Sequence, residues 1–241
     1  MIDWHSHVLP AMDDGSHNPA ESLQMLQAQA AQGITTVIAT PHFYANDESV
    51  DSFLARRDSA AARLREQLPE DGVPTLLLGA EVRYYPGISR MEGLTSLCIE
   101  GTRLLLLEMP FSHWTDSMVR ELIELSGKDG ICLVLAHIDR YLSQQSRAVW
   151  DTLLDNGVLM QANASFFTAF STRRKALTLL DGGYVHLLGS DCHNMTSRPP
   201  KIGAALDGIR RRCGADYLMQ INEYGYSLFD THNYSVQERK I

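Results

Sequence analysis

The sequence predicts an α/β protein, a closed or nearly closed (β/α) barrel of about seven strands, formed by residues 1–241 as a single domain. Three observations lead to this fold. Seven short apolar runs recur along the chain, helix-favouring stretches separate them, and six of the seven runs end at a His, Asp or Glu. Alternation of strand and helix predicts a parallel sheet, and about seven such units are enough to close it into a barrel.

The apolar runs have the length and composition of strands buried on both faces. Continuous runs of this kind are typical of a parallel sheet that is covered by helices. They comprise residues 1–4, 35–40, 75–80, 103–107, 131–136, 158–162 and 184–190.

Helix-favouring stretches lie between these runs. The first is residues 19–32, preceded by Asn18 as a capping residue and beginning with Pro19, which suits the first helical position. Further amphipathic stretches cover residues 49–67, 117–126 and 173–180, and residues 217–241 should form a closing strand or helix followed by a polar tail. No linker, repeat or low-complexity segment divides the chain, which favours one domain.

Composition excludes several classes of protein. With 44% hydrophobic and 21% charged residues, the chain of 241 residues is typical of a globular protein. Its formal net charge of -8 argues against nucleic-acid binding, which usually requires a basic face. The four cysteines form no CxxC pair, no signal peptide precedes the first run, and no apolar run reaches the ~18 residues of a membrane helix. We therefore expect a cytoplasmic protein without a membrane insertion.

The polar residues at the run ends are candidates for metal ligands. Active sites of (β/α) barrels lie at the carboxyl ends of the strands. His5 and His7 are two residues apart and so point to the same side of a strand. Asp191 and His193 repeat this spacing after the last run, and closure of the barrel would bring the two pairs together. The intervening run ends supply His42, Glu81, Glu108 and His137.

Other polar residues have competing interpretations. Asp14 lies in the first loop and is a candidate ligand, although Asp13–Gly15 also forms an ordinary turn. Cys192 lies between two candidate ligands, and strand alternation should turn its side chain away into the packing. We expect loop positions for His17 and His113, a packed position for His186, and no role for His232.

Imidazoles mixed with carboxylates suit Mn, Fe or Zn. About eight ligand side chains oversupply one ion and favour two or three, with Glu81 or a water as the bridge. Adjacent ions activate water and hold both oxygens of an in-line displacement, which is phosphoryl-transfer chemistry, although amide and lactone hydrolysis use similar centres. Arg140 and Arg198 follow two candidate ligands and favour a phosphate ester, unless they are surface arginines in salt bridges.

The motifs together resemble the PHP (polymerase and histidinol phosphatase) superfamily, and more closely its bacterial CpsB/CapC-type protein-tyrosine phosphatases, from residue 1 to about residue 206. The segments that carry the resemblance are Asp3-Trp4-His5-Ser6-His7, Asp13-Asp14-Gly15, Thr40-Pro41-His42, Gly79-Ala80-Glu81-Val82, Leu106-Leu107-Glu108, His137-Ile138-Asp139-Arg140-Tyr141 and Ser190-Asp191-Cys192-His193-Asn194. One departure is Ile138-Asp139, where the family often has Pro-Glu. Because Arg140 and Tyr141 are retained, we expect activity to be retained.

The resemblance implies the PHP fold, a distorted (β/α)7 TIM-like barrel, with three metal ions, of which Mn is the expected species. The first would bind His5, His7, Glu81 and Asp191; the second Glu81, Glu108 and His137; the third Asp14, His42 and His193. Arg140 and Arg198 would hold the phosphate while a metal-bound hydroxide attacks phosphorus. The implied substrate is phosphotyrosine in the tail of a bacterial tyrosine autokinase that controls capsule or exopolysaccharide synthesis.

Two other functions share these motifs. A small-molecule phosphatase, acting for example on histidinol phosphate, would need the same metals and arginines. A non-catalytic regulator could keep the metal-binding barrel and bind a kinase or transport partner, although the complete set of candidate ligands argues against it. A homo-oligomer is also possible through the amphipathic helix at residues 21–32, whose apolar residues are equally explained as its core face.

Overall fold

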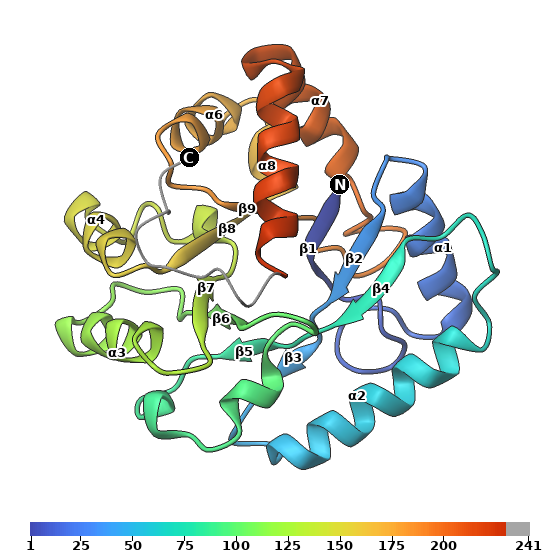
Figure 1. Cartoon of the computed structure of the whole chain (residues 1–241), viewed down its shortest axis with the longest axis horizontal. Coiled ribbons are helices and arrows are strands. Elements are labelled where there is room, and N and C mark those ends of the chain that lie inside the picture. The colour runs from blue at the N-terminus through green and yellow to red at the C-terminus, as the bar shows by residue number, and fades with distance from the viewer. Residues whose placement is uncertain (230–241) are drawn as a thin grey trace.

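A computed structural model describes residues 1–229 as a curled parallel sheet surrounded by helices (Figure 1). The strand segments are β1 (Ile2–Ser6), β2 (Thr36–Ala39), β3 (His42–Phe43), β4 (Thr75–Leu78), β5 (Glu81–Arg83), β6 (Leu104–Glu108), β7 (Cys132–Leu135), β8 (Leu159–Asn163) and β9 (Leu187–Gly189). Every paired strand is parallel to its neighbour.

These nine segments form seven barrel strands. The pairing orders are β1-β2-β4 and β3-β5-β6-β7-β8-β9. Residues 40–41 separate β2 from β3 and residues 79–80 separate β4 from β5, so each pair is one strand with a break in the middle. Pro41 at the first break has no N–H to donate to a neighbouring strand.

The barrel closes between its first and last strands. Ser6 and Cys192 form a parallel bridge, His7 N donates to Cys192 O at 2.9 Å, and Asp191 N donates to His5 O at 2.8 Å. This closure confirms the predicted (β/α)7 architecture. It also places the loops that follow β1 and β9 side by side.

The helices are α1 (Pro19–Ala30), α2 (Val50–Arg65), α3 (Asp116–Ser126), α4 (Arg147–Asp155), α5 (Ala164–Thr168), α6 (Arg173–Asp181), α7 (Ile202–Cys213) and α8 (Ala215–Ser227). Short 3-10 turns are η1 (Ile88–Arg90), η2 (Leu94–Leu97) and η3 (Ile138–Arg140). The predicted start of α1 is confirmed: Asn18 caps it by accepting from Glu21 N at 3.0 Å, and Pro19 begins the helix.

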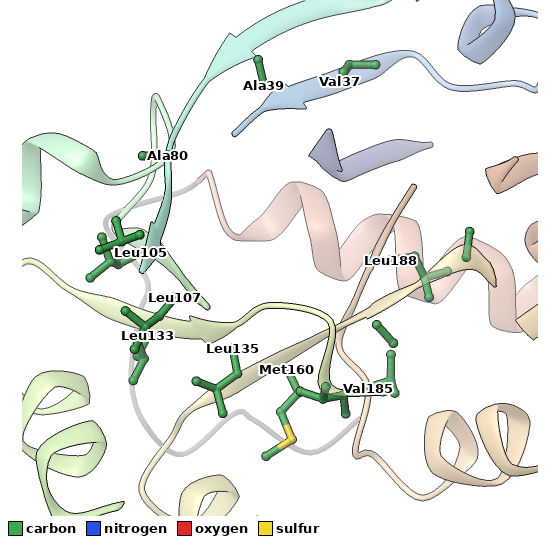
Figure 2. Packing of buried hydrophobic residues seen from close by; sticks show 14 of the residues in the cluster. Val37, Ala39, Ala80, Leu105, Leu107, Leu133, Leu135, Met160, Val185 and Leu188 are labelled. Atoms are coloured by element: carbon green, nitrogen blue, oxygen red, sulfur yellow. The ribbon is translucent and has the colours of Figure 1, made fainter. Parts of the chain in front are cut away.

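Two apolar layers hold the fold together. Figure 2 shows members of the outer layer on successive strands, from Val37 on β2 to Leu188 on β9. The inner layer includes Ile2, Leu106 and Val134 and is joined by Leu228 at the end of α8. Burial of both strand faces explains why the strands read as continuous apolar runs.

The structure adds three helices for which no range is predicted above: α4, α5 and α7. Helix α5 is too short to show a period, but α4 and α7 are amphipathic. Ile202, Ala205, Leu206 and Ile209 of α7 have the i, i+3, i+4, i+7 spacing of one buried helix face, so the sequence does contain a helical signal there. The last run is also shorter as a strand than predicted, since β9 covers Leu187–Gly189 alone. The closing element is the helix α8, and residues 230–241, including His232, lie outside the described residues.

No helix within residues 1–229 is long and apolar enough to cross a membrane. All four cysteines are free thiols.

Candidate metal centre

The nine predicted ligands come together at the carboxyl ends of the strands. Most of their side chains are buried; Asp14 is the exposed exception. They lie near the end of β1 and at the end of β6, at the strand breaks where β3 and β5 begin, or in the loops that follow β1, β7 and β9, and comprise His5, His7, Asp14, His42, Glu81, Glu108, His137, Asp191 and His193. The structure thus brings together every residue of the predicted set.

Glu81 lies at the centre of this cluster. Its Oε2 is 3.2 Å from His5 Nε2, 3.3 Å from His7 Nε2 and 3.0 Å from His42 Nδ1. Its Oε1 is 2.9 Å from His137 Nε2. Burial would raise the pKa of the Glu81 carboxyl, but the facing imidazoles, above all His5, hold that pKa well below its usual value. Glu81 is therefore an ionised carboxylate in contact with four histidines.

Asp14 lies beside two of the candidate histidines. Asp14 Oδ1 lies 3.3 Å from His193 Nε2 and 3.5 Å from His42 Nε2. Ligand atoms within 4.8 Å of one another define three overlapping groups: His7, Asp14, His42 and His193; His5, His7 and Glu81; and His42, Glu81 and Glu108. These overlap the three sets implied by the family resemblance but share His7 and His42 between groups.

The donor atoms fit divalent cations. His5 Nε2 and His7 Nε2 face each other at 3.2 Å, and Asp191 Oδ1 is 3.6 Å from the latter. Among residues 1–229, the buried His42 Nδ1 and His193 Nε2 make no well-aligned hydrogen bond, although both point at carboxylates of the cluster. Converging nitrogen and carboxylate donors of this kind suit Mn, Fe or Zn.

Two residues that are not predicted above orient the first histidines. Asp13 accepts from His7 Nδ1 at 2.7 Å, and Gln161 Oε1 accepts from His5 Nδ1 at 3.1 Å and from His137 N at 2.7 Å. With Nδ1 donating, Nε2 is the nitrogen left to bind a metal. Asp13 belongs to the Asp13-Asp14-Gly15 motif, so a sequence signal for it exists. Gln161 lies within an apolar strand, and no sequence pattern marks it as an orienting residue.

Strand β8 ends in an amide, the exception among the seven run ends. Asn163 Nδ2 donates to Asp191 Oδ2 at 2.8 Å, and Asn163 N donates to Asp139 Oδ1 at 3.0 Å. Asp139 is one of the two residues that depart from the usual family motif, and its carboxylate accepts this hydrogen bond from the end of β8. Asn163 and Gln161 therefore orient ligands.

Both predicted arginines lie at the rim of the cluster. Arg140 donates to Asp191 Oδ2, and Arg198 Nη2 donates to Asp191 Oδ1 at 2.8 Å. Arg198 Nη1 is also 3.7 Å from Asp14 Oδ2. Their side chains are 33% and 38% exposed, so solvent reaches both guanidinium groups beside the candidate ligands.

Two candidate ligands have left-handed backbone conformations. His137 has φ 32° and ψ 56°, and Asp191 has φ 51°. A non-glycine residue in this region costs of order 1–3 kcal/mol and persists where the surrounding structure requires it. The positions of these two side chains therefore depend on backbone turns that no sequence pattern predicts.

The other histidines and Cys192 agree with their predicted positions. His17 is exposed and pairs with Glu21 at 3.0 Å, and His113 is exposed with its Nδ1 3.0 Å from a backbone carbonyl. His186 is buried and its Nδ1 accepts from Met160 N at 3.1 Å. Cys192 is buried in the outer apolar layer.

Gly189 permits the close packing of His5. A Cβ at this position would lie 2.5 Å from His5 Cβ and 2.8 Å from Gln161 Nε2. We expect Gly189→Ala to displace His5, lower the melting temperature and reduce metal content, because overpacking of this kind costs about 1–3 kcal/mol. The measurement is thermal unfolding together with metal analysis.

Gly208 in α7 provides the matched control. A Cβ there would have its nearest neighbour at 4.0 Å, so Gly208→Ala should leave metal content unchanged and raise stability by up to about 1 kcal/mol. Wild-type metal content in Gly189→Ala would contradict the proposed packing.

Metal binding should release protons from two histidines. Burial opposes the charge on His7, yet hydrogen bonds to Asp13 and Glu81 raise its pKa to about 10. Burial likewise opposes charge on His137, but Glu108 and Glu81 raise its pKa to about 9. Both histidines should therefore be protonated at neutral pH without metal, and the affinity for a divalent ion should rise with pH up to about 9–10. At pH 7.5, metal binding should release about two protons.

His193 should not contribute to this release, because burial and the charge of His7 lower its pKa to about 4. The measurement is calorimetric titration with Mn²⁺ in two buffers of different ionisation enthalpy. Identical enthalpies in both buffers would show that no proton is released.

The fold and the cluster define a class: a parallel barrel with a candidate metal site of clustered histidines and carboxylates on one side of the barrel. The family model described as "Capsular polysaccharide synthesis, CpsB/CapC" matches residues 1–224. The chain therefore belongs to the CpsB/CapC family.

Curated relatives cover nearly the whole chain. It is 31% identical to tyrosine-protein phosphatase YwqE of Bacillus subtilis (strain 168), over 92% of this chain and 89% of the relative. It is 29% identical to tyrosine-protein phosphatase CpsB of Streptococcus pneumoniae, over 89% of this chain and 92% of the relative. The two relatives are named for the same activity.

Solved structures agree with this placement. Solved structures of YwqE and CpsB from these two species are described as unique metal-dependent tyrosine phosphatases. One of them superposes on this chain with a TM-score of 0.81 at 26% identity, over 95% of this chain and 94% of that chain. A variant of organophosphorus hydrolase superposes with a TM-score of 0.52 at 14% identity, over 95% of this chain and 91% of that one. That likeness shows the barrel fold alone.

Proposed function

We propose that this protein is a metal-dependent protein-tyrosine phosphatase. The observation that carries the proposal is the convergence of eight other candidate ligands around the buried carboxylate of Glu81, with two arginines at the rim, in a member of the CpsB/CapC family. The relatives and the solved structures named for this activity match over most of their length.

The candidate ligands would hold two or three divalent ions, with Mn as the species we propose. When bound, adjacent ions lower the pKa of water and stabilise charge on the attacking and leaving oxygens. The ion sets proposed are His5, His7, Glu81 and Asp191; Glu81, Glu108 and His137; and Asp14, His42 and His193.

Arg140 and Arg198 would bind the transferring phosphoryl group. Their guanidinium groups reach the same carboxylate of Asp191 from the rim, so both donate toward one point beside the cluster. A planar guanidinium binds phosphate oxygens in pairs and stabilises their developing charge. Asp13, Gln161 and Asn163 would keep the ligands oriented during turnover.

The substrate we propose is phosphotyrosine on a cytoplasmic tyrosine autokinase that controls capsular polysaccharide synthesis. The names of the relatives support phosphotyrosine as the substrate, and the family description supports the link to capsular polysaccharide synthesis. The four free thiols are typical of a reducing compartment.

The test is hydrolysis of a phosphotyrosine peptide by the Mn-loaded protein, beside a phosphoserine peptide and histidinol phosphate, with and without chelator. Chelator-sensitive preference for phosphotyrosine is the expected result. Preference for histidinol phosphate would replace the substrate by a small molecule, and absence of turnover with full metal content would favour a non-catalytic regulator.

A further inference from the structure

Phe111 is an exposed aromatic residue in the loop that follows β6. It is 48% exposed, whereas Met109 and Trp114 in the same loop are buried. The loop begins at the carboxyl end of the strand that supplies Glu108, so it belongs to the side of the barrel that carries the metal centre. Nearly half of the Phe111 side chain is therefore open to solvent on the face that carries the candidate ligands.

The position of the ring is fixed by its neighbours. Phe111 stacks against Tyr141 with ring centroids 5.4 Å apart and planes inclined by 29°. It also stacks against His137, a candidate ligand, with centroids 6.1 Å apart and planes inclined by 23°. An aromatic ring held in this way offers its exposed surface without losing much side-chain freedom when a ligand binds.

Tyr141 itself is rigidly held. It is fully buried, its hydroxyl accepts from Met109 N at 3.1 Å, and its ring packs against Trp114 with centroids 5.2 Å apart. Tyr141 and Met109 therefore connect the β6 loop to the turn that carries Arg140. This connection fixes Phe111 relative to the candidate phosphate-binding group.

The guanidinium group of Arg140 lies over the Phe111 ring. The guanidinium carbon of Arg140 is 5.8 Å from the centroid of Phe111. A phosphoryl group bound to Arg140 would place the first atoms of its ester substituent next to the ring. An aromatic substituent fits there, because aromatic pairs prefer offset-stacked or edge-to-face contacts with centroids about 4.5–7 Å apart.

We propose that Phe111 is a specificity-determining residue that packs against the aromatic ring of phosphotyrosine while Arg140 holds its phosphate. This inference rests on the proposed function and extends it to the selection of aryl over alkyl phosphates. A seryl phosphate has one methylene where phosphotyrosine has a ring, so it reaches the arginine without contacting Phe111.

The test compares binding of phenylphosphonate and methylphosphonate to the metal-loaded protein, with wild type, Phe111→Ala and Phe111→Tyr. We expect Phe111→Ala to weaken phenylphosphonate binding about 3- to 10-fold, the range of one aromatic pair, with methylphosphonate binding unchanged. Phe111→Tyr should retain the wild-type ratio. The same loss should appear in KM for a phosphotyrosine peptide, with kcat nearly unchanged.

Tyr226→Ala is the matched control, since Tyr226 is 44% exposed and its hydroxyl is 3.0 Å from Thr35 Oγ1, before the amino end of β2. It should leave both affinities unchanged. Equal weakening of both phosphonates by Phe111→Ala, or no weakening of either, would overturn the inference. Because the readout is binding, a wild-type protein that fails to hydrolyse phosphotyrosine would refute the proposed function while leaving the Phe111 test intact.

Discussion

Glu81→Gln is expected to lose bound metal and to lower phosphotyrosine turnover about 10³-fold or more, because the ions supply several kcal/mol of transition-state stabilisation. Four imidazoles face this one carboxylate at distances of 2.9–3.3 Å, so no other side chain can take its place. The amide keeps the volume of the side chain and removes its negative charge. Metal analysis and steady-state rates on the same sample are the measurement.

The substitution also removes the anion that balances buried histidines, so thermal unfolding must be followed alongside. Removing one partner of a buried charged group typically costs about 3–5 kcal/mol. Glu100→Gln is a suitable control, since that carboxylate is 52% exposed and lies 4.0 Å from Arg65, outside the cluster. A folded Glu81→Gln with wild-type metal content and rate would exclude Glu81 as the bridging ligand.

Arg140→Ala is expected to spare the metals and to lower kcat about 10²-fold or more, the usual cost of removing a donor to the transferring group. Metal binding should survive because Asp191 is still held by Arg198 and Asn163, each at 2.8 Å. Arg140→Lys should recover part of the rate, since it keeps the charge but not the paired N–H donors.

Arg147→Ala is the control for this prediction. Arg147 is 80% exposed and pairs with Asp151 on the same helix, so its removal should leave the rate unchanged. If Arg140→Ala turned over phosphotyrosine at the wild-type rate, the proposed role of Arg140 would be wrong.

The barrel could be predicted because its strands are buried on both faces and end at polar residues. A continuous apolar run such as residues 104–107 predicts a strand that is buried on both faces. The polar residues that follow such runs lie at the same edge of a parallel barrel. The spacing of His5 and His7 and of Asp191 and His193 then identified the two loops that meet when the barrel closes.

The residues that orient the ligands could not be predicted in the same way. Gln161 and Asn163 act through hydrogen bonds across the barrel to His5 and Asp191, partners that are far away in the sequence. The left-handed turns at His137 and Asp191 depend on the packed barrel and leave no residue pattern, since neither position is a glycine. Helix α5, with five residues, is too short to show a helical period.

We propose that the histidine–carboxylate cluster hydrolyses phosphotyrosine through its bound ions. The most direct measurement is the rate of phosphotyrosine hydrolysis by metal-depleted protein as Mn²⁺ is restored, with bound metal determined at each step. We expect no activity without metal and a rate that rises with occupancy to two or three ions per chain. A full rate in protein shown to be free of metal would contradict the account.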